Sequence, residues 1–420
     1  MSKKRGAAVS KLIRIFGVIL LCLVVGSGAE AAATSSSSLK HKSSGTTHAS
    51  ASGKTHASKT TAKSTKTASK TMTASGRHSH GARTKLAVRR TRHYERFSAS
   101  SFADNLTLGD VTEGEDPVVR AAAIEALGNM NGTAVAIDPS TGRILAMVNQ
   151  KLALSRGAEP CSTIKLTVAL AALEENIVKR DTPVNLGGRY HLTMTEALAH
   201  SNNAYFETLG RSLGFERVKH YANEFGLGEL AGYHIQGEQL GIYPDEELPA
   251  KLGGVGRMCS FGESVSMTPL QLGALVSAIA NGGTLYYLQH PENAIDIASF
   301  EPRVKRQLNI APLIPEILDG MQGAVMYGTA RSLRANFSEF PVMGKTGTCS
   351  NNGTRFGWFG SYADTPNGRI VTVFFLEGGR PTFGPKAAEL TGQFYRALWD
   401  KSYFLPRTQQ ASGVGSLGSE

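Results

Sequence analysis

Residues 159–165 read Glu-Pro-Cys-Ser-Thr-Ile-Lys and place a serine in the first turn of an expected helix, with a lysine three residues later. Positions i and i+3 share one helix face, so the Ser162 hydroxyl and the Lys165 amine can be hydrogen-bonded neighbours. A serine hydroxyl becomes a nucleophile when a base takes its proton, and a desolvated lysine beside other cations can be that base. Because a capping serine followed by a surface lysine gives the same pattern, the motif needs support from elsewhere in the chain.

Two further motifs follow in the sequence. Residues 201–203 read Ser-Asn-Asn after an Ala/Leu-rich helical stretch and offer a hydroxyl and an amide, although a helix cap uses the same residue types. Residues 345–348 read Lys-Thr-Gly-Thr after an apolar pair. A lysine on a strand provides a fixed cation for a substrate carboxylate, and Gly347 lets a substrate backbone approach closely. Three weak signals in a fixed order form a strong one.

The elements expected around these motifs indicate an α+β body. Residues 132–149 contain two β-rich runs joined by Asp-Pro-Ser-Thr-Gly, which is typical hairpin chemistry, and further strands are expected at 341–349, 355–363 and 369–377. Helices are expected at 116–127, 162–178, 195–225 (a run of helices), 267–281, 313–334 and 386–401. Strands at both ends with helices between predict an antiparallel sheet that joins N- and C-terminal segments, flanked by helices and by an all-helical subdomain.

The basic charge of the chain is confined to its N-terminal part. Residues 1–96 hold 19 of the 45 Lys and Arg residues and two of the 34 acids, a charge of +17, which leaves −6 for residues 97–420. That remainder has no basic stripe interleaved with aromatic residues, which argues against nucleic-acid binding. We expect this remainder to form one folded domain at 97–405, followed by a flexible Gly/Ser-rich tail at 406–420.

Residues 1–33 have the pattern of an export signal. A basic start leads into an apolar stretch from Ile15 to Ala29 and then into small residues. This stretch is shorter than the roughly 20 residues that span a bilayer, which favours a cleaved signal over a membrane anchor and leaves both readings open. Either reading places the folded domain in a periplasmic or other extracytoplasmic compartment.

Residues 34–96 are rich in Ser, Thr, Ala, Lys and His and poor in large apolar side chains. Such a segment cannot bury enough surface to offset its chain entropy, so we expect a disordered basic linker. It serves either as a solvated spacer or as a contact with an anionic membrane or wall polymer.

The three motifs resemble those of the penicillin-binding protein transpeptidase domain, within the serine β-lactamase and D,D-peptidase superfamily. The resemblance rests on residues 159–165, 199–206 and 344–348, extends to the hairpin at 137–146 and to the helix at 267–283, and covers roughly 115–402. It implies a serine D,D-transpeptidase or D,D-carboxypeptidase that forms an acyl-enzyme with the D-Ala-D-Ala stem peptides of peptidoglycan, for cross-linking or trimming. It also implies that β-lactams acylate the same serine. The four cysteines show no Cys/His spacing of the zinc kind, so we expect no metal site, and we expect no cofactor.

The resemblance also implies a role for each motif residue. Ser162 attacks the penultimate D-Ala carbonyl while Lys165 accepts its proton, Ser201 relays a proton to the departing amine, and Asn203 holds the substrate amide. The terminal carboxylate is bound by Lys345 with the hydroxyls of Thr346 and Thr348. The backbone N–H groups of Ser162 and Thr348 form the oxyanion hole.

Two cysteines flank the two implied oxyanion donors, since Cys161 precedes Ser162 and Cys349 follows Thr348. If both donors point at one oxygen, their neighbours come within the roughly 4.4–6.8 Å Cα separation of a disulfide. The same two positions carry a disulfide in some carbapenem-hydrolysing class A β-lactamases. We therefore predict a Cys161–Cys349 bridge, with two free buried thiols as the alternative, and expect Cys259 to be structural and unpaired.

Two other functions stay open. A β-lactamase needs a carboxylate that activates the deacylating water, in a Glu-x-x-Asn setting, or a carboxylated lysine. The sequence shows no such Glu motif, Glu238 resembles a non-catalytic Gly-Glu of transpeptidases, and Asn203 departs from the Ser-x-Val of the lysine-carboxylated class. A non-catalytic β-lactam-binding sensor would keep the full set of Ser162, Lys165 and Lys345.

Overall fold

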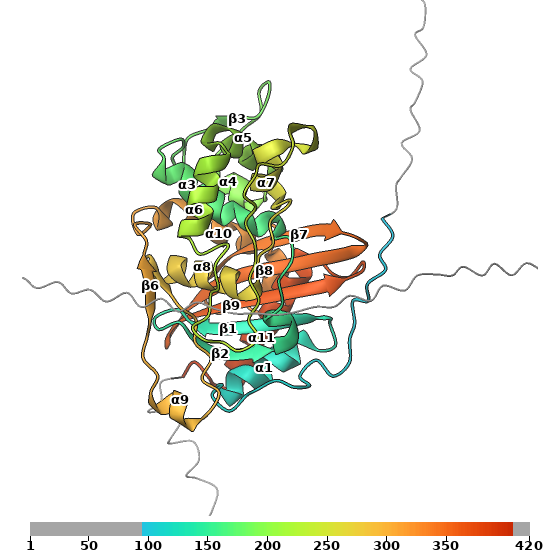
Figure 1. Ribbon diagram of the computed structural model, residues 1–420, viewed down its shortest axis with the longest axis vertical. Coiled ribbons are helices and arrows are strands. Elements are labelled where there is room, and N and C mark those ends of the chain that lie inside the picture. Colours follow the sequence, from blue (N-terminus) through green and yellow to red (C-terminus); the bar gives the residue numbers. More distant parts are fainter. Residues whose placement is uncertain (1–94, 406–420) are drawn as a thin grey trace, which may run out of the picture. The chain divides into compact units, whose positions relative to one another are not determined.

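The computed structural model describes residues 95–405 (Figure 1). The predicted signal at 1–33, nearly all of the predicted linker at 34–96 and the predicted tail at 406–420 lie outside the described residues and stay predictions. Among the helices of residues 95–405, none is long and apolar enough to cross a membrane.

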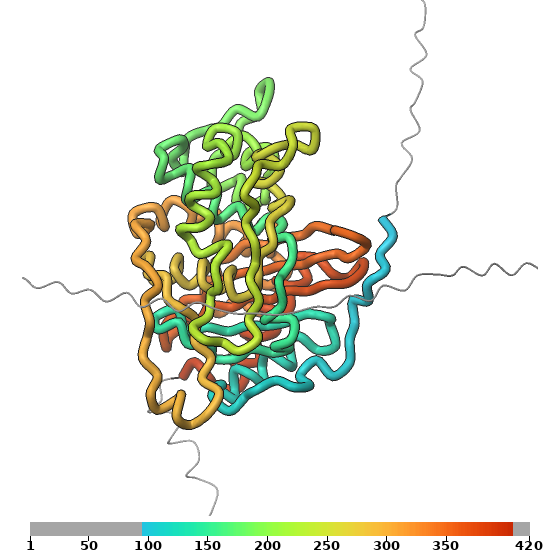
Figure 2. Tube along the Cα trace, viewed as in Figure 1, coloured from blue at the N-terminus to red at the C-terminus, as the bar shows by residue number. Residues whose placement is uncertain are grey.

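A five-stranded antiparallel sheet forms the centre of the described chain, in the order β2-β1-β9-β8-β7. Its strands are β1 (Gly132–Asp138), β2 (Arg143–Val148), β7 (Val342–Asn351), β8 (Thr354–Thr365) and β9 (Gly368–Gly378). The sheet joins strands from both ends of the described chain, which Figure 2 shows as green-blue and orange-red traces in one layer. The predicted α+β fold with an antiparallel sheet is confirmed.

The two faces of the sheet pack against separate apolar cores. Side chains of β9 alternate between them with the period of two expected of a strand: one core receives Val371, Val373 and Phe375, and the other Ile370, Phe374 and Leu376. Helices α1 (Pro117–Leu127) and α11 (Gly384–Asp400) cover the second face, while α8 (Pro269–Asn281) packs on the first (Figure 1). The sheet is thereby buried on both sides.

The all-helical part lies on the side of the sheet away from α1 and α11 (Figure 1). It contains α3 (Lys165–Glu174), α4 (Met194–Ala199), α5 (Asn203–Leu213), α6 (Phe215–Glu224), α7 (Gly254–Phe261) and α10 (Ile314–Met326). Shorter elements are α2 (Gln150–Ala153), α9 (Ala294–Ala298), the 3₁₀ turns η1 (Cys161–Ile164), η2 (Ala250–Leu252) and η3 (Arg331–Ala335), and the strands β3 (Val184–Asn185), β4 (His191–Leu192), β5 (Thr284–Tyr286) and β6 (Val304–Gln307).

Several helix ends agree with the sequence signals and others do not. Helix α8 starts with Pro269, close to the start predicted at residue 267, and the structure adds a capping box formed by Thr268 and Gln271. The helix expected to reach residue 178 ends at Glu174, because Asn176 takes a left-handed backbone with φ 53°. The helix expected to reach residue 334 ends at Met326, because the chain turns at Gly328 and continues into η3.

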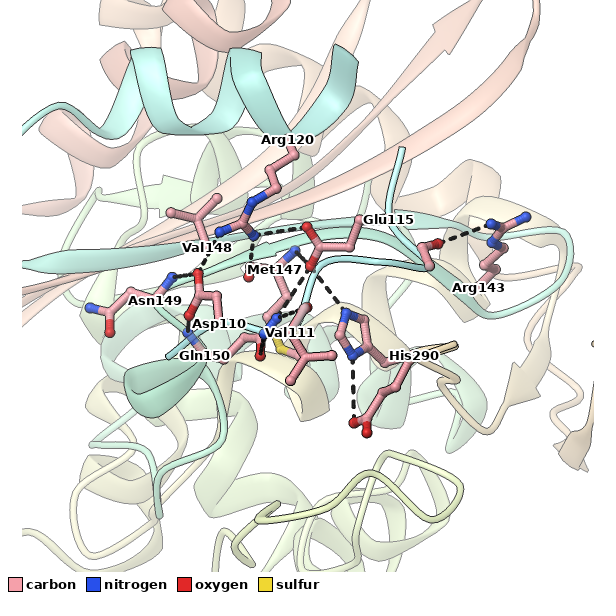
Figure 3. Close-up of polar contacts among 12 residues, drawn as sticks. Asp110, Val111, Glu115, Arg120, Arg143, Met147, Val148, Asn149, Gln150 and His290 are labelled. Atoms are coloured by element: carbon pink, nitrogen blue, oxygen red, sulfur yellow. Dashed lines mark hydrogen bonds and ion pairs between the residues drawn. The ribbon is translucent and has the colours of Figure 1, made fainter. Parts of the chain in front are cut away.

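A buried network of charged side chains fastens residues 110–120 to β2 (Figure 3). The fully buried Glu115 carboxylate accepts hydrogen bonds from the Arg120 guanidinium at 2.8 Å, from the backbone N–H of Met147 at 2.9 Å and from the His290 ring at 3.0 Å. Arg120 also pairs with Asp110 at 2.8 Å. Each buried charge in this network has a partner, as burial requires.

Glu115→Ala is expected to lower the free energy of unfolding by about 3–5 kcal/mol, because it removes a buried carboxylate and leaves the largely buried Arg120 without one of its counter-charges. Urea denaturation of the full chain measures the loss. Glu125→Ala is the control, because it removes an exposed partner of Lys401, and is expected to cost less than about 1 kcal/mol. Equal effects of the two substitutions would contradict a stabilising role for the network.

Candidate active site

Ser162 lies in the 3₁₀ turn η1, immediately before α3, and is partly exposed. Lys165 is the first residue of α3 and is completely buried, with its Nζ 2.9 Å from Ser162 Oγ. The turn keeps both residues on one side of the chain even though the first turn is 3₁₀ and not α. The predicted Ser-Lys pair is thus present in the structure.

The second motif meets this pair from the connection between α4 and α5. Lys165 Nζ lies 3.1 Å from Ser201 Oγ, 2.9 Å from the Ser201 carbonyl oxygen and 2.7 Å from Asn203 Oδ1. Lys345, on β7, brings its own Nζ to 2.8 Å from Ser201 Oγ. Ser201 therefore bridges two lysine amines, and all five polar side chains form one continuous hydrogen-bonded cluster.

Burial governs the protonation of the two lysines, each of which has no exposed surface. Loss of hydration holds the pKa of Lys165 well below its usual range, the nearby charge of Lys345 lowers it further, and Glu207 opposes the shift. Burial alone lowers the pKa of Lys345 to about 7. A neutral Lys165 amine next to the Ser162 hydroxyl can act as a general base.

Two residues of the site have a left-handed backbone that side chains other than Gly and Asn seldom adopt. They are Cys161, with φ 51°, and Ser201, with φ 54°. Such backbone strain persists where surrounding contacts enforce it, and it is frequent at functional sites. Sequence patterns gave no sign of either conformation, because neither residue is glycine or asparagine.

The third motif lies on β7, at the free edge of the sheet within the described chain. The Thr346 hydroxyl donates to Thr329 Oγ1 at 2.6 Å, and the Thr348 hydroxyl oxygen accepts from the backbone N–H of Gly384 at 2.8 Å. A Cβ on Gly347 would lie 2.8 Å from the Pro160 carbonyl oxygen. The glycine thus lets β7 pack against the turn that carries Ser162, which is a packing role beside the predicted approach of substrate.

The disulfide predicted between Cys161 and Cys349 is confirmed, with a Cα–Cα separation of 5.5 Å. It ties η1 to β7 directly beside Ser162 and Thr348. Cys259 is buried and is the unpaired cysteine of residues 95–405, as expected. Burial raises the pKa of the Cys259 thiol, which makes it a poor nucleophile.

The sequence motifs assign no role to three neighbours of the cluster. The Phe206 ring lies 5.5 Å from Lys165 Nζ, Glu207 acts on the Lys165 charge, and Thr329 bonds to the third motif. Phe206 and Glu207 follow Asn203 by three and four residues on α5, so helical periodicity could have found them. Thr329 lies in a segment that was expected to be helical, which concealed it.

Glu238, considered above as a residue of the family, bonds to the backbone. Its carboxylate accepts from the N–H groups of Ala231 and Gly232 at 2.8–3.1 Å. It therefore holds the loop that follows α6 in place.

Comparison with known proteins agrees with this geometry. Residues 132–396, more than half of the chain, match the model of the penicillin binding protein transpeptidase domain. The chain therefore belongs to the penicillin-binding protein transpeptidase family.

Curated relatives include stage V sporulation protein D of Bacillus subtilis, 33% identical over 258 residues, and the peptidoglycan D,D-transpeptidase FtsI of Escherichia coli, 24% identical over 291 residues. The matches cover 51% and 61% of this chain, and they span 39% and 46% of those relatives, less than half of their length. The solved structure of Pseudomonas aeruginosa PBP2 shares the fold with a TM-score of 0.56 at 22% identity, covering 70% of this chain and 76% of that one.

Proposed function

We propose that this chain is a serine D,D-transpeptidase or D,D-carboxypeptidase that acts on the D-Ala-D-Ala ends of peptidoglycan stem peptides. The observation that carries the proposal is the position of Lys165 Nζ, within 3.1 Å of Ser162 Oγ, Ser201 Oγ and Asn203 Oδ1. A buried amine in that place can take a proton from one hydroxyl and pass it toward another. Family membership supports the same reaction class.

In the proposed first step, Ser162 Oγ attacks the carbonyl carbon of the penultimate D-Ala as its proton moves to Lys165. The backbone N–H groups of Ser162 and Thr348 stabilise the oxyanion that forms, as preorganised donors do in acyl transfer. The C–N bond then breaks, and the proton travels through Ser201 to the departing amine of the terminal D-Ala. Ser201 is suited to this relay because it contacts both lysine amines.

Substrate binding is proposed to use the remaining motif residues. Lys345, Thr346 and Thr348 hold the terminal carboxylate, Asn203 holds a substrate amide, and Gly347 allows the peptide to lie close to β7. The acyl-enzyme then passes its acyl group to an amine, which cross-links, or to water, which trims. β-Lactams present a carbonyl and a carboxylate in the same relation and are proposed to acylate Ser162.

The proposal also covers the N-terminal part of the chain. We propose that residues 1–33 direct export and that residues 34–96 act as a basic tether in an extracytoplasmic compartment, either as a spacer or in contact with anionic lipids or wall polymers.

The reaction type is tested by incubating the purified full chain with a D-Ala-D-Ala pentapeptide and a competing amine. Free D-Ala alone indicates a carboxypeptidase, and free D-Ala with a coupled product indicates a transpeptidase. Stoichiometric labelling by a fluorescent penicillin, lost in Ser162→Ala, is expected in both cases. Labelling without D-Ala release would point to a sensor, and sustained nitrocefin turnover would point to a β-lactamase.

The lowered pKa of Lys345 predicts a pH dependence of stability. A lysine whose pKa is about 7 in the folded state and about 10.4 in the unfolded state opposes folding when protonated, so its penalty is full below pH 7. Above pH 7 the folded state binds fewer protons than the unfolded state, and stability rises with pH. We expect the titration of Lys345 to raise the free energy of unfolding by about 1 kcal/mol per pH unit between pH 7 and 9. A single titrating group can contribute at most about 1.4 kcal/mol per pH unit.

Urea denaturation at several pH values measures this slope in the wild type and in Lys345→Met. The variant is expected to lose the Lys345 contribution, while Lys151→Met, a change at an exposed lysine, keeps the wild-type slope. Parallel curves for wild type and Lys345→Met would contradict the assignment.

A further inference from the structure

The turn that ends α10 lies against the second catalytic motif. A Cβ on Gly328 would be 2.1 Å from the carbonyl oxygen of Ala199, so only glycine fits at that contact. The backbone N–H of the next residue, Thr329, donates to the same Ala199 oxygen at 3.1 Å. The turn is thus pinned to the end of α4, two residues before Ser201.

The side chain of Thr329 contacts the third motif. Thr346 Oγ1 donates to Thr329 Oγ1 at 2.6 Å, and Thr346 is only 4% exposed. Among the hydrogen bonds of residues 95–405, this is the one made by the Thr329 hydroxyl. Thr329 therefore joins the segment of Ser201 through its backbone and the segment of Lys345 through its side chain.

In the hydrogen bond between Thr346 and Thr329, which hydroxyl donates the proton matters for carboxylate binding. A carboxylate only accepts hydrogen bonds, so Thr346 can bind one only by donating its proton to it. In the structure that proton is given to Thr329. When Thr346 turns its proton toward a carboxylate, its oxygen is free to accept from Thr329, because a hydroxyl group both donates and accepts.

We propose that Thr329 is a positioning residue for recognition of the terminal carboxylate of the donor. It accepts from Thr346 in the free enzyme and donates to Thr346 when a carboxylate is bound, which keeps the Thr346 side chain in one orientation in both states. The proposal rests on the proposed function, since it takes a D-Ala-D-Ala peptide or a β-lactam as the carboxylate ligand.

Thr329→Val and Thr329→Ser test the proposal, because valine keeps the shape without the hydroxyl and serine keeps the hydroxyl. With a peptide that ends in a free carboxylate, Thr329→Val is expected to raise KM about fivefold, the loss expected for one hydrogen bond between neutral groups, with kcat changed less than about threefold. Thr329→Ser is expected to restore most of the loss. With the same peptide ending in an amide, wild type and Thr329→Val should differ little.

Controls separate this role from a structural one and from failure of the proposed function. Thr391→Val removes a buried hydroxyl on α11, which donates to Ala387, and is expected to leave both peptides unaffected. If Thr329→Val slows both peptides equally, or Thr329→Ser does not recover, the positioning role is wrong. If the wild type releases no D-Ala at all, the proposed function fails, and the carboxylate-bearing fluorescent penicillin still tests Thr329 through its acylation rate.

Discussion

Replacing Lys165 by methionine is expected to slow acylation of Ser162 by about 10²–10⁴-fold, the range that a general base contributes. Methionine keeps the length and apolar character of the stem and removes the amine that lies 2.9 Å from Ser162 Oγ. Because the wild-type amine is buried and its pKa is well below the usual range, burial favours the neutral form, which can accept a proton. The rate is measured as time-resolved labelling by a fluorescent penicillin.

The fold is expected to survive this change. A buried amine beside a second one contributes desolvation and charge repulsion, and an apolar side chain of similar volume in such a place is often neutral or stabilising. Lys165→Met should therefore unfold at the same or a higher urea concentration than wild type, which separates loss of the base from loss of structure. A Lys165→Met enzyme that labels within tenfold of wild type would show that another group takes the Ser162 proton.

The central residues of the site could be predicted because their arrangement depends on short-range rules. Ser162 and Lys165 are three residues apart on a helical turn, and Lys345 is fixed by the alternation of a strand. The meeting of these residues with Ser201 depends on the tertiary fold, and the sequence indicated it only through resemblance to a family. The bridge between Cys161 and Cys349 followed from that same arrangement and is present.

The residues that sequence reasoning missed depend on how the chain turns. Thr329 was assigned to a helix that continued to residue 334, because the apolar pattern contains no proline to end it. The structure ends that helix at Met326, where the backbone of Gly328 contacts the carbonyl of Ala199, a contact 129 residues away in sequence. Local patterns carry no information on such a contact, so Thr329 and the left-handed backbone of Ser201 became visible only in the fold.

Removing the disulfide by the double substitution Cys161→Ala and Cys349→Ala is expected to lower the free energy of unfolding by about 2–5 kcal/mol. The two cysteines are 188 residues apart, and a crosslink that closes so long a loop restricts the unfolded chain strongly. Acylation should slow as well, by up to about 10²–10³-fold, the effect of losing one oxyanion donor. The reason is that Cys161 holds a left-handed backbone next to Ser162, while Cys349 follows Thr348 on β7.

Reduction of the wild-type chain gives the same test without a substitution. Thiol titration of the unfolded chain should find two more thiols after reduction than before it, and unfolding is needed because Cys161 and Cys259 are both buried in the fold. Cys259→Ala is the matched control, because it removes a cysteine but leaves the bridge, and it is expected to keep the acylation rate. Loosening the turn at Cys161 displaces the Ser162 N–H but leaves Lys165 in place, so the reduced enzyme should still be labelled slowly by the fluorescent penicillin. The acylation rate of Lys165→Met, in contrast, should not recover under any redox condition. If the reduced enzyme labels as fast as the oxidised one, the bridge stabilises the fold without positioning the oxyanion donors.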